Sequence, residues 1–63
     1  MEHLLIERNP AIMIGKPVIR GTRITVELLK AKILNGFSVD EILEMYPHLS
    51  TLQIQAAFAF QNS

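Results

Sequence analysis

Apolar residues recur with the spacing of an α-helix in three segments of the second half of the chain. In the first, Val26, Leu29 and Ile33 stand at i, i+3 and i+7, which places them on one helix face. In the second, residues 39–46, the apolar positions are Val39, Ile42, Leu43 and Tyr46. The third, residues 51–61, is apolar on more than one face, so we expect it to be buried on more than one side.

Helix-capping residues stand at the ends of these segments. Thr25 precedes the first segment, and Asn35–Gly36 ends it, because glycine accepts the left-handed conformation of a helix C-cap. Ser38–Glu41 and Ser50–Gln53 are capping boxes, in which a serine is followed three residues later by Glu or Gln. Pro47 ends the second helix near Met45. A short helix, a tight turn and another helix form the outline of a helix-turn-helix unit.

The first 24 residues have a β-rich pattern instead. Two short apolar runs, Ile12–Ile14 and Val18–Ile19, flank a break at Gly15–Pro17, which predicts a small β-hairpin. Pro17 cannot donate a ladder hydrogen bond, so it belongs at an edge or in the turn. We therefore predict a single, mainly α domain: residues 1–24 form an N-terminal β-arm and residues 25–63 a three-helix unit.

Composition suggests that this domain does not exist alone. A chain of 63 residues buries only about 60% of its unfolded surface. It has no cysteine, yet 49% of its residues are hydrophobic, which is more than one small core readily hides. We therefore predict a homodimer or a permanent partner. Ile54, Phe58 and Phe60 of the last helix are the expected apolar dimer or partner surface.

The same data bear on location. No apolar run approaches the length of about 18 residues that a membrane span needs, so no membrane contact is expected. The N-terminal residues, Met1–Ile6, are too short and too acidic a segment for a signal peptide. The expectation is a cytoplasmic protein.

Charge is unevenly distributed, although the formal net charge is zero. All six basic residues lie between Arg8 and Lys32. Residues 1–33 also contain three acidic residues, so this part of the chain carries a formal charge of +3. Residues 34–63 hold Asp40, Glu41 and Glu44 without Lys or Arg, so they carry −3. Such asymmetry either marks a surface for a charged partner or arises by chance in so short a chain.

Nothing in the sequence points to catalysis, a metal or a cofactor. His48 lies in a turn, and the three carboxylates suit the start of a helix. The spacing of Gly15 and Gly21 superficially resembles a phosphate-binding loop, but Pro17 removes a backbone N–H that such a loop would use. We therefore expect a protein that is not an enzyme.

The basic run Gly15–Thr25 is the best candidate for a binding site. The expected contact residues are Lys16, Arg20, Thr22 and Arg23. Docking of the helix-turn-helix on DNA is disfavoured, because phosphate contacts need Lys or Arg, and the two helices carry none. Three alternatives stay open for Arg20 and Arg23: DNA in a groove, carboxylates on a protein partner, or bonds that hold their own backbone.

The run GKPVIRGTRIT resembles the bacterial and archaeal family called domain of unknown function 433. The similarity continues at Asn9, Pro10 and Ile12, at Thr25–Val26, at Gly36, Ser38, Glu41 and Ile42, at Tyr46, Pro47, Leu49 and Ser50, and at Ile54, Ala56 and Ala57. The resemblance implies a homeodomain-like or winged-helix-like fold. It also implies an antitoxin, often encoded beside a PIN-like ribonuclease, that binds the toxin and represses its own operon as a dimer. The family motif maps onto Gly15, Lys16, Pro17, Arg20, Gly21, Thr22 and Arg23.

The expected function is thus that of an antitoxin of a type II toxin–antitoxin pair. It would inhibit a PIN-like ribonuclease and bind operator DNA as a second activity; the alternative is a stand-alone helix-turn-helix transcriptional regulator. Lys16, Arg20, Thr22 and Arg23 would contact the partner. Gly15, Pro17 and Gly21 would shape the motif, the glycines by positive φ or close chain approach.

Overall fold

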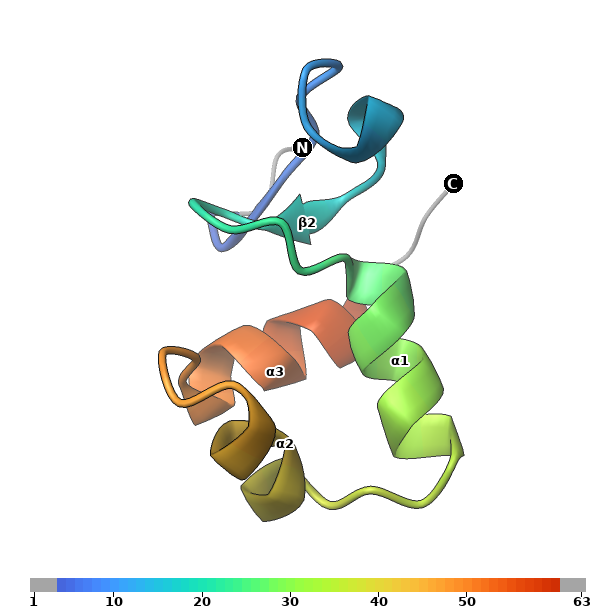
Figure 1. Cartoon of the computed structure of the whole chain (residues 1–63), viewed down its shortest axis with the longest axis vertical. Helices are drawn as coiled ribbons and strands as arrows, with labels where there is room; N and C mark the ends of the chain where they lie inside the picture. Colours follow the sequence, from blue (N-terminus) through green and yellow to red (C-terminus); the bar gives the residue numbers. More distant parts are fainter. Residues whose placement is uncertain (1–3, 61–63) are drawn as a thin grey trace.

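A computed structural model describes residues 4–60 and shows a mainly helical domain (Figure 1). In chain order the elements are β1 (Ile6–Glu7), the 3-10 turn η1 (Met13–Gly15), β2 (Val18–Ile19), α1 (Val26–Leu34), α2 (Val39–Met45) and α3 (Thr51–Ala59). The β-strands and η1 lie at one end, and the three helices lie at the other. The predicted fold class, three helices with a short antiparallel pair of strands before them, is confirmed.

Local side-chain hydrogen bonds set the helix starts where the sequence predicts them. The Thr25 hydroxyl accepts a hydrogen bond from the Leu28 backbone N–H at 3.0 Å. Ser38 and Ser50 each form a complete capping box, with Glu41 and Gln53 as the reciprocal acceptors. Each cap satisfies backbone N–H groups that lack a partner within the helix. Because these signals are local, the predicted starts of all three helices are confirmed.

The C-terminus of α1 is a Schellman motif. Gly36 has φ +96°, a left-handed conformation that costs glycine little. Its N–H donates to the Ile33 carbonyl oxygen, and the N–H of Phe37 donates to the Lys32 carbonyl oxygen, both at 3.0 Å. These two bonds close the helix in the pattern expected for a glycine C-cap.

The strand pairing differs from the predicted hairpin. β2 pairs antiparallel with β1, with Ile6 opposite Ile19 and Glu7 opposite Val18. The run Ile12–Ile14, which we expected to be the partner strand, instead forms consecutive turns. The Ile12 N–H donates to the Asn9 carbonyl oxygen at 2.8 Å, and the Ala11 N–H to Asn9 Oδ1 at 2.9 Å. Turn bonds started by Asn9–Pro10 therefore override the β propensity of the apolar run.

The second edge of β2 is also occupied. The Ile19 N–H donates to the Ile24 carbonyl oxygen at 2.9 Å, and the Val26 N–H donates to the Pro17 carbonyl oxygen at 3.0 Å. Val18 forms a bridge with Thr25. Pro17 contributes only its carbonyl oxygen, so its missing N–H costs no hydrogen bond. The segment from Pro17 to Ile19 is thus hydrogen-bonded on both sides.

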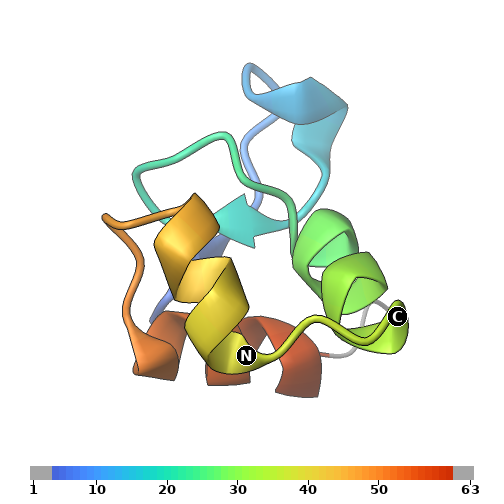
Figure 2. The same ribbon diagram turned by 60° about the horizontal axis from the view of Figure 1, so that its bottom comes forward.

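The core lies where β1, β2 and the helices meet. Its buried side chains come from every helix and both strands: Ile6, Ile19, Val26, Leu29, Ile42, Leu49, Ile54, Ala56 and Ala57. α1 packs on α3 more extensively than on α2. Figure 2, which turns the helical end toward the viewer, shows β2 behind the helices. The N-terminal segment is therefore part of the core rather than an arm that extends from it.

Turn η1 has an unusual backbone. The Gly15 N–H donates to the Ile12 carbonyl oxygen at 3.1 Å, and the two central residues, Met13 and Ile14, have φ of +50° and +57°. Positive φ at both central positions is the type I′ geometry, which favours Asn and Gly. A β-branched residue such as Ile14 is disfavoured there, because its Cβ crowds the backbone.

We expect Ile14→Gly to raise the free energy of unfolding by about 1 kcal/mol, since the relief of left-handed strain exceeds the entropy that glycine adds to the unfolded chain. Urea denaturation at a protein concentration low enough to keep every variant monomeric measures this change, because association would add its own stabilisation to the wild-type protein. Ile14→Ala is the matched control, because alanine keeps the strained φ and should give little gain. A destabilised Ile14→Gly variant would show that the turn is not strained.

Candidate functional site

The centre of the basic motif is a tight turn. The Thr22 N–H donates to the Ile19 carbonyl oxygen at 3.0 Å, and Gly21, the third residue of the turn, has φ +80°. This is the type II geometry, which requires glycine or asparagine at that position. Gly15 likewise has φ +78°, so the predicted positive φ of both glycines is confirmed.

Thr22 stabilises this turn with its side chain. Its hydroxyl donates to the Ile19 carbonyl oxygen at 2.8 Å and accepts from the Ile24 N–H at 3.0 Å. The side chain is only partly exposed. Thr22 thus has a structural role that the sequence analysis did not assign to it.

Arg20 fastens the turn to the N-terminal segment. Its Nε donates to the Leu4 carbonyl oxygen at 2.8 Å, and its Nη1 lies 3.5 Å from Glu7 Oε1. The other carboxylate oxygen of Glu7 accepts a long bond, 3.4 Å, from the Gly21 N–H. Of the three alternatives for Arg20, the structure shows the bonds of the structural one.

Lys16 and Pro17 differ from each other in exposure. Lys16 Nζ lies 3.2 Å from Glu27 Oε1, and 53% and 76% of the two side chains are exposed. Such exposed pairs contribute about 0–1 kcal/mol, so Lys16 can exchange Glu27 for another carboxylate at little cost. Pro17 is buried and serves the fold through the carbonyl bond to Val26.

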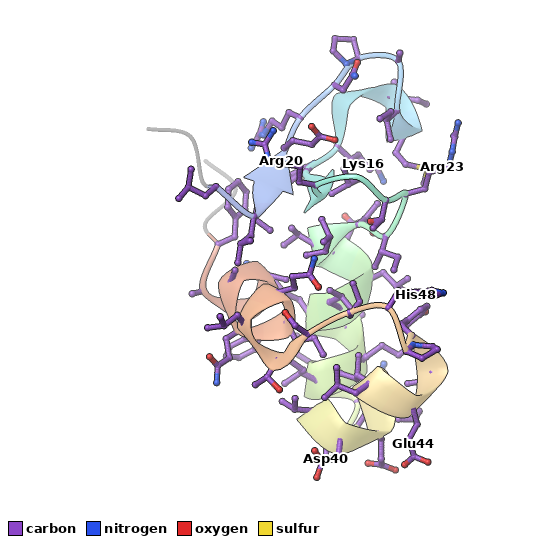
Figure 3. All side chains as sticks on the ribbon, turned by 90° about the vertical axis from the view of Figure 1, so that its left-hand side faces the viewer. Lys16, Arg20, Arg23, Asp40, Glu44 and His48 are labelled. Atoms are coloured by element: carbon purple, nitrogen blue, oxygen red, sulfur yellow. The ribbon has the colours of Figure 1, made fainter. Side chains whose placement is uncertain are left out.

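Arg23 is the basic residue of the motif whose side chain does not contribute to the fold. Its side chain is exposed, and within residues 4–60 it has no hydrogen bond or ion pair. Figure 3 shows the side chain extending away from the ribbon. The ordered turn at Ile19–Thr22 fixes the backbone just before it, so the guanidinium is presented from a defined position.

A groove beside the motif was missed by the sequence analysis. Its volume is about 420 Å³. Apolar side chains of the motif and of α1 line it together with three charged ones: Pro17, Val26, Ala31, Leu34, Lys16, Glu27 and Lys30. A signal was present in the sequence, because Glu27, Ala31 and Leu34 share a helix face at i, i+4 and i+7 that the core does not use.

The predicted apolar surface of α3 needs one correction. Ile54 is fully buried within the chain, so its assignment to a dimer or partner surface was wrong. It faces inward with Ala57, three residues on. Phe58 does lie at the surface, with 51% exposed, and lines a smaller groove of about 290 Å³ with Ile33, Val39, Gln55 and the otherwise buried Ile54.

Phe60 is only partly exposed and packs against the core. The Arg8 guanidinium lies 5.9 Å from the centroid of its ring, within the range of a cation–π contact. Lys30 donates a hydrogen bond from Nζ to the backbone carbonyl oxygen of Phe60. Phe60 thus closes the fold on the basic side of the molecule.

The two ends of the molecule differ in charge. In Figure 3, Lys16, Arg20 and Arg23 lie at the end formed by the N-terminal segment, and Asp40 and Glu44 of α2 lie at the other. Neither α2 nor α3 contains Lys or Arg. A surface formed by α2 and α3 would therefore repel phosphate or leave it unpaired.

Metal sites and membrane spans are two other features that a small domain can carry. Residues 4–60 contain no group of three or more His, Cys, Asp or Glu that could hold a metal ion. None of the described helices is long and apolar enough to cross a membrane.

Comparison with known proteins assigns the family. The sequence profile described as "Protein of unknown function (DUF433)" matches residues 6–60. The chain belongs to this family. The match covers the helices, both strands and the whole basic motif, so the family resemblance predicted from GKPVIRGTRIT is confirmed.

One curated relative is "Uncharacterized protein y4eO" of Sinorhizobium fredii (strain NBRC 101917 / NGR234), which is 38% identical over 59 residues. The alignment covers 94% of this chain but 27% of the relative, so the chain spans about a quarter of that protein's length. No solved structure matches.

We expect Arg20→Ala to lower the free energy of unfolding by about 1–2 kcal/mol, because a hydrogen bond from a charged donor and a half-exposed ion pair are lost. Arg23→Ala should change it by less than about 0.5 kcal/mol. Urea denaturation of both variants measures the difference. Equal effects of the two substitutions would contradict the structural role of Arg20.

Proposed function

We propose that the protein is an antitoxin that binds and inhibits a ribonuclease of the PIN-like class. The observation that carries this proposal is Arg23, an exposed guanidinium without a partner among the described residues, presented from an ordered turn. A guanidinium binds carboxylates through two parallel hydrogen bonds. Nucleases of this class hold their metal with clustered carboxylates, to which Arg23 would bind.

The charge distribution supports a protein as the main partner, with DNA as a second one. Of the basic residues in the motif Gly15–Thr25, Arg20 is bonded to Leu4 and Glu7, and Lys16 is paired with Glu27. α2 is acidic, and α3 has no positive charge. Duplex binding needs several phosphate contacts at once, whereas one well-placed arginine is enough to anchor a protein interface.

The proposal has four further parts. First, the antitoxin is not itself an enzyme. Second, it acts in the cytoplasm, where the ribonuclease that it inhibits would degrade RNA. Third, it is a homodimer, as its apolar composition suggests. Fourth, operator binding by the basic end of the molecule is the second activity.

The proposal requires a PIN-like nuclease gene beside the gene for this chain, and co-expression with the product of such a gene tests it. Wild-type antitoxin should restore growth, and Arg23→Glu should abolish the rescue, because the reversed charge repels the carboxylates. Lys32→Glu is the matched control: it makes the same charge change in the last turn of α1 and should retain the rescue. Full rescue by soluble Arg23→Glu, or the absence of any nuclease gene nearby, would overturn the proposal.

DNA binding is measured separately with a duplex from the chain's own promoter. If the basic end binds phosphate, affinity should fall steeply as salt rises, and Arg23→Ala should reduce the slope of log K against log salt by about 1. Binding of this duplex without any nuclease interaction would instead favour a stand-alone regulator. No band shift at low salt would exclude the operator activity.

A further inference from the structure

Ile14 is held in an unfavourable position in two respects. Its side chain is 93% exposed, so nearly all of its apolar surface meets water. Its φ of +57° is one that β-branched residues avoid. Met13, beside it, shares the positive φ and is also exposed. Backbone hydrogen bonds from Gly15 and Lys16 hold the turn, but no part of residues 4–60 covers the Ile14 side chain, which suggests that Ile14 is a contact residue for another surface.

An apolar groove lies next to this projection. Lys16 and Pro17, two and three residues after Ile14, form one wall, and α1 forms the other through Val26, Ala31 and Leu34. Leu34 is 79% exposed. The exposure of Ile14 shows that it does not fill the groove of its own chain. The groove therefore lies next to the exposed Ile14 side chain, and that side chain does not occupy it.

This arrangement fits a second copy of the same chain. When a projection and a cavity lie side by side on one face, a two-fold axis lets each copy insert its projection into the cavity of the other. The rim charges suit this symmetry, since Lys16 and Glu27 form an exposed ion pair there, with Lys16 Nζ 3.2 Å from Glu27 Oε1. Across a two-fold axis, Lys16 of each copy can pair instead with Glu27 of the other copy, so neither charge loses its partner.

We propose that the chain forms a two-fold dimer in which Ile14 of each copy inserts between Pro17 and α1 of the other copy. The interface is then at the basic motif and α1, not at α3, where the sequence analysis placed it. This proposal rests on the homodimer that is part of the proposed function and adds the interface, but its tests need no nuclease and so can fail separately from the antitoxin activity.

Sedimentation at micromolar concentration provides the first test. Wild-type protein should be dimeric, and Ile14→Asp should raise the dissociation constant at least about 100-fold, because two buried isoleucines are each worth about tenfold or more. Ile14→Gly should also dissociate the dimer and still fold, which separates loss of the contact from unfolding. Leu52→Asp, at an exposed position of α3, is the matched control and should leave the dimer intact.

The outcomes that overturn the proposal are distinct. A monomeric wild-type protein means that another molecule, or none, occupies the groove. A dimer that survives Ile14→Asp and Ile14→Gly but dissociates with Leu52→Asp places the interface on α3. Circular dichroism of each variant confirms that the helices are retained.

Cross-linking tests the contact directly, because the chain has no cysteine and engineered thiols have no background. A mixture of Ile14→Cys and Leu34→Cys chains should form a disulfide between different chains on oxidation, since bridged Cα atoms must lie about 4.4–6.8 Å apart. Each variant alone should form little. A mixture that gives no such product while remaining dimeric would refute the reciprocal insertion.

Discussion

The segment Pro17–Ile19, which contains β2, is hydrogen-bonded on both edges, and the rest of the fold depends on this. Val18 and Ile19 are fully buried. On one side the Arg20 N–H donates to the Leu5 carbonyl oxygen, and on the other the Val26 N–H donates to that of Pro17. Val26 is the first residue of α1, so the strand fixes where this helix begins. Because α1 packs on α3, the position of the helices follows from the strand.

This constraint explains why a run with so many basic residues is largely structural. Gly21 makes the turn that follows the strand, Thr22 closes it with two hydrogen bonds, and Arg20 joins it to Leu4 and Glu7. Charges in a sequence suggest a partner, but a guanidinium also bonds well to backbone carbonyl oxygens. In this motif only Arg23 is left without such a role among the described residues.

The helices could be predicted because their signals are local. A capping box spans four residues, and Pro47 follows Tyr46, the C-cap residue of α2, so that the helix ends at Met45. The strand pairing could not be predicted in this way, because Ile6 and Ile19 are distant in sequence and their register depends on burial. The run Ile12–Ile14 has high β propensity, but the turn bonds from Asn9 and Ile12 determine its conformation.

The candidate site was predicted less completely, because the exposure and pairing of its side chains depend on residues that only folding brings together. Periodicity identifies α3 as apolar on several faces but cannot say that Ile54 faces the core while Phe58 faces solvent. Whether an arginine is paired or free depends on groups that folding brings to it, as Glu7 is brought to Arg20. The positive φ of Ile14 has no counterpart in sequence patterns, since no residue type there suggests a left-handed turn.

The cost of that turn is large relative to the size of the domain. A 63-residue chain without disulfides has a small core, and its net stability is on the order of a few kcal/mol. A strained, water-exposed isoleucine removes a larger share of that stability than it would in a larger domain. Insertion into the groove of a second copy would offset both costs at once, because it buries the side chain and stabilises the turn that presents it.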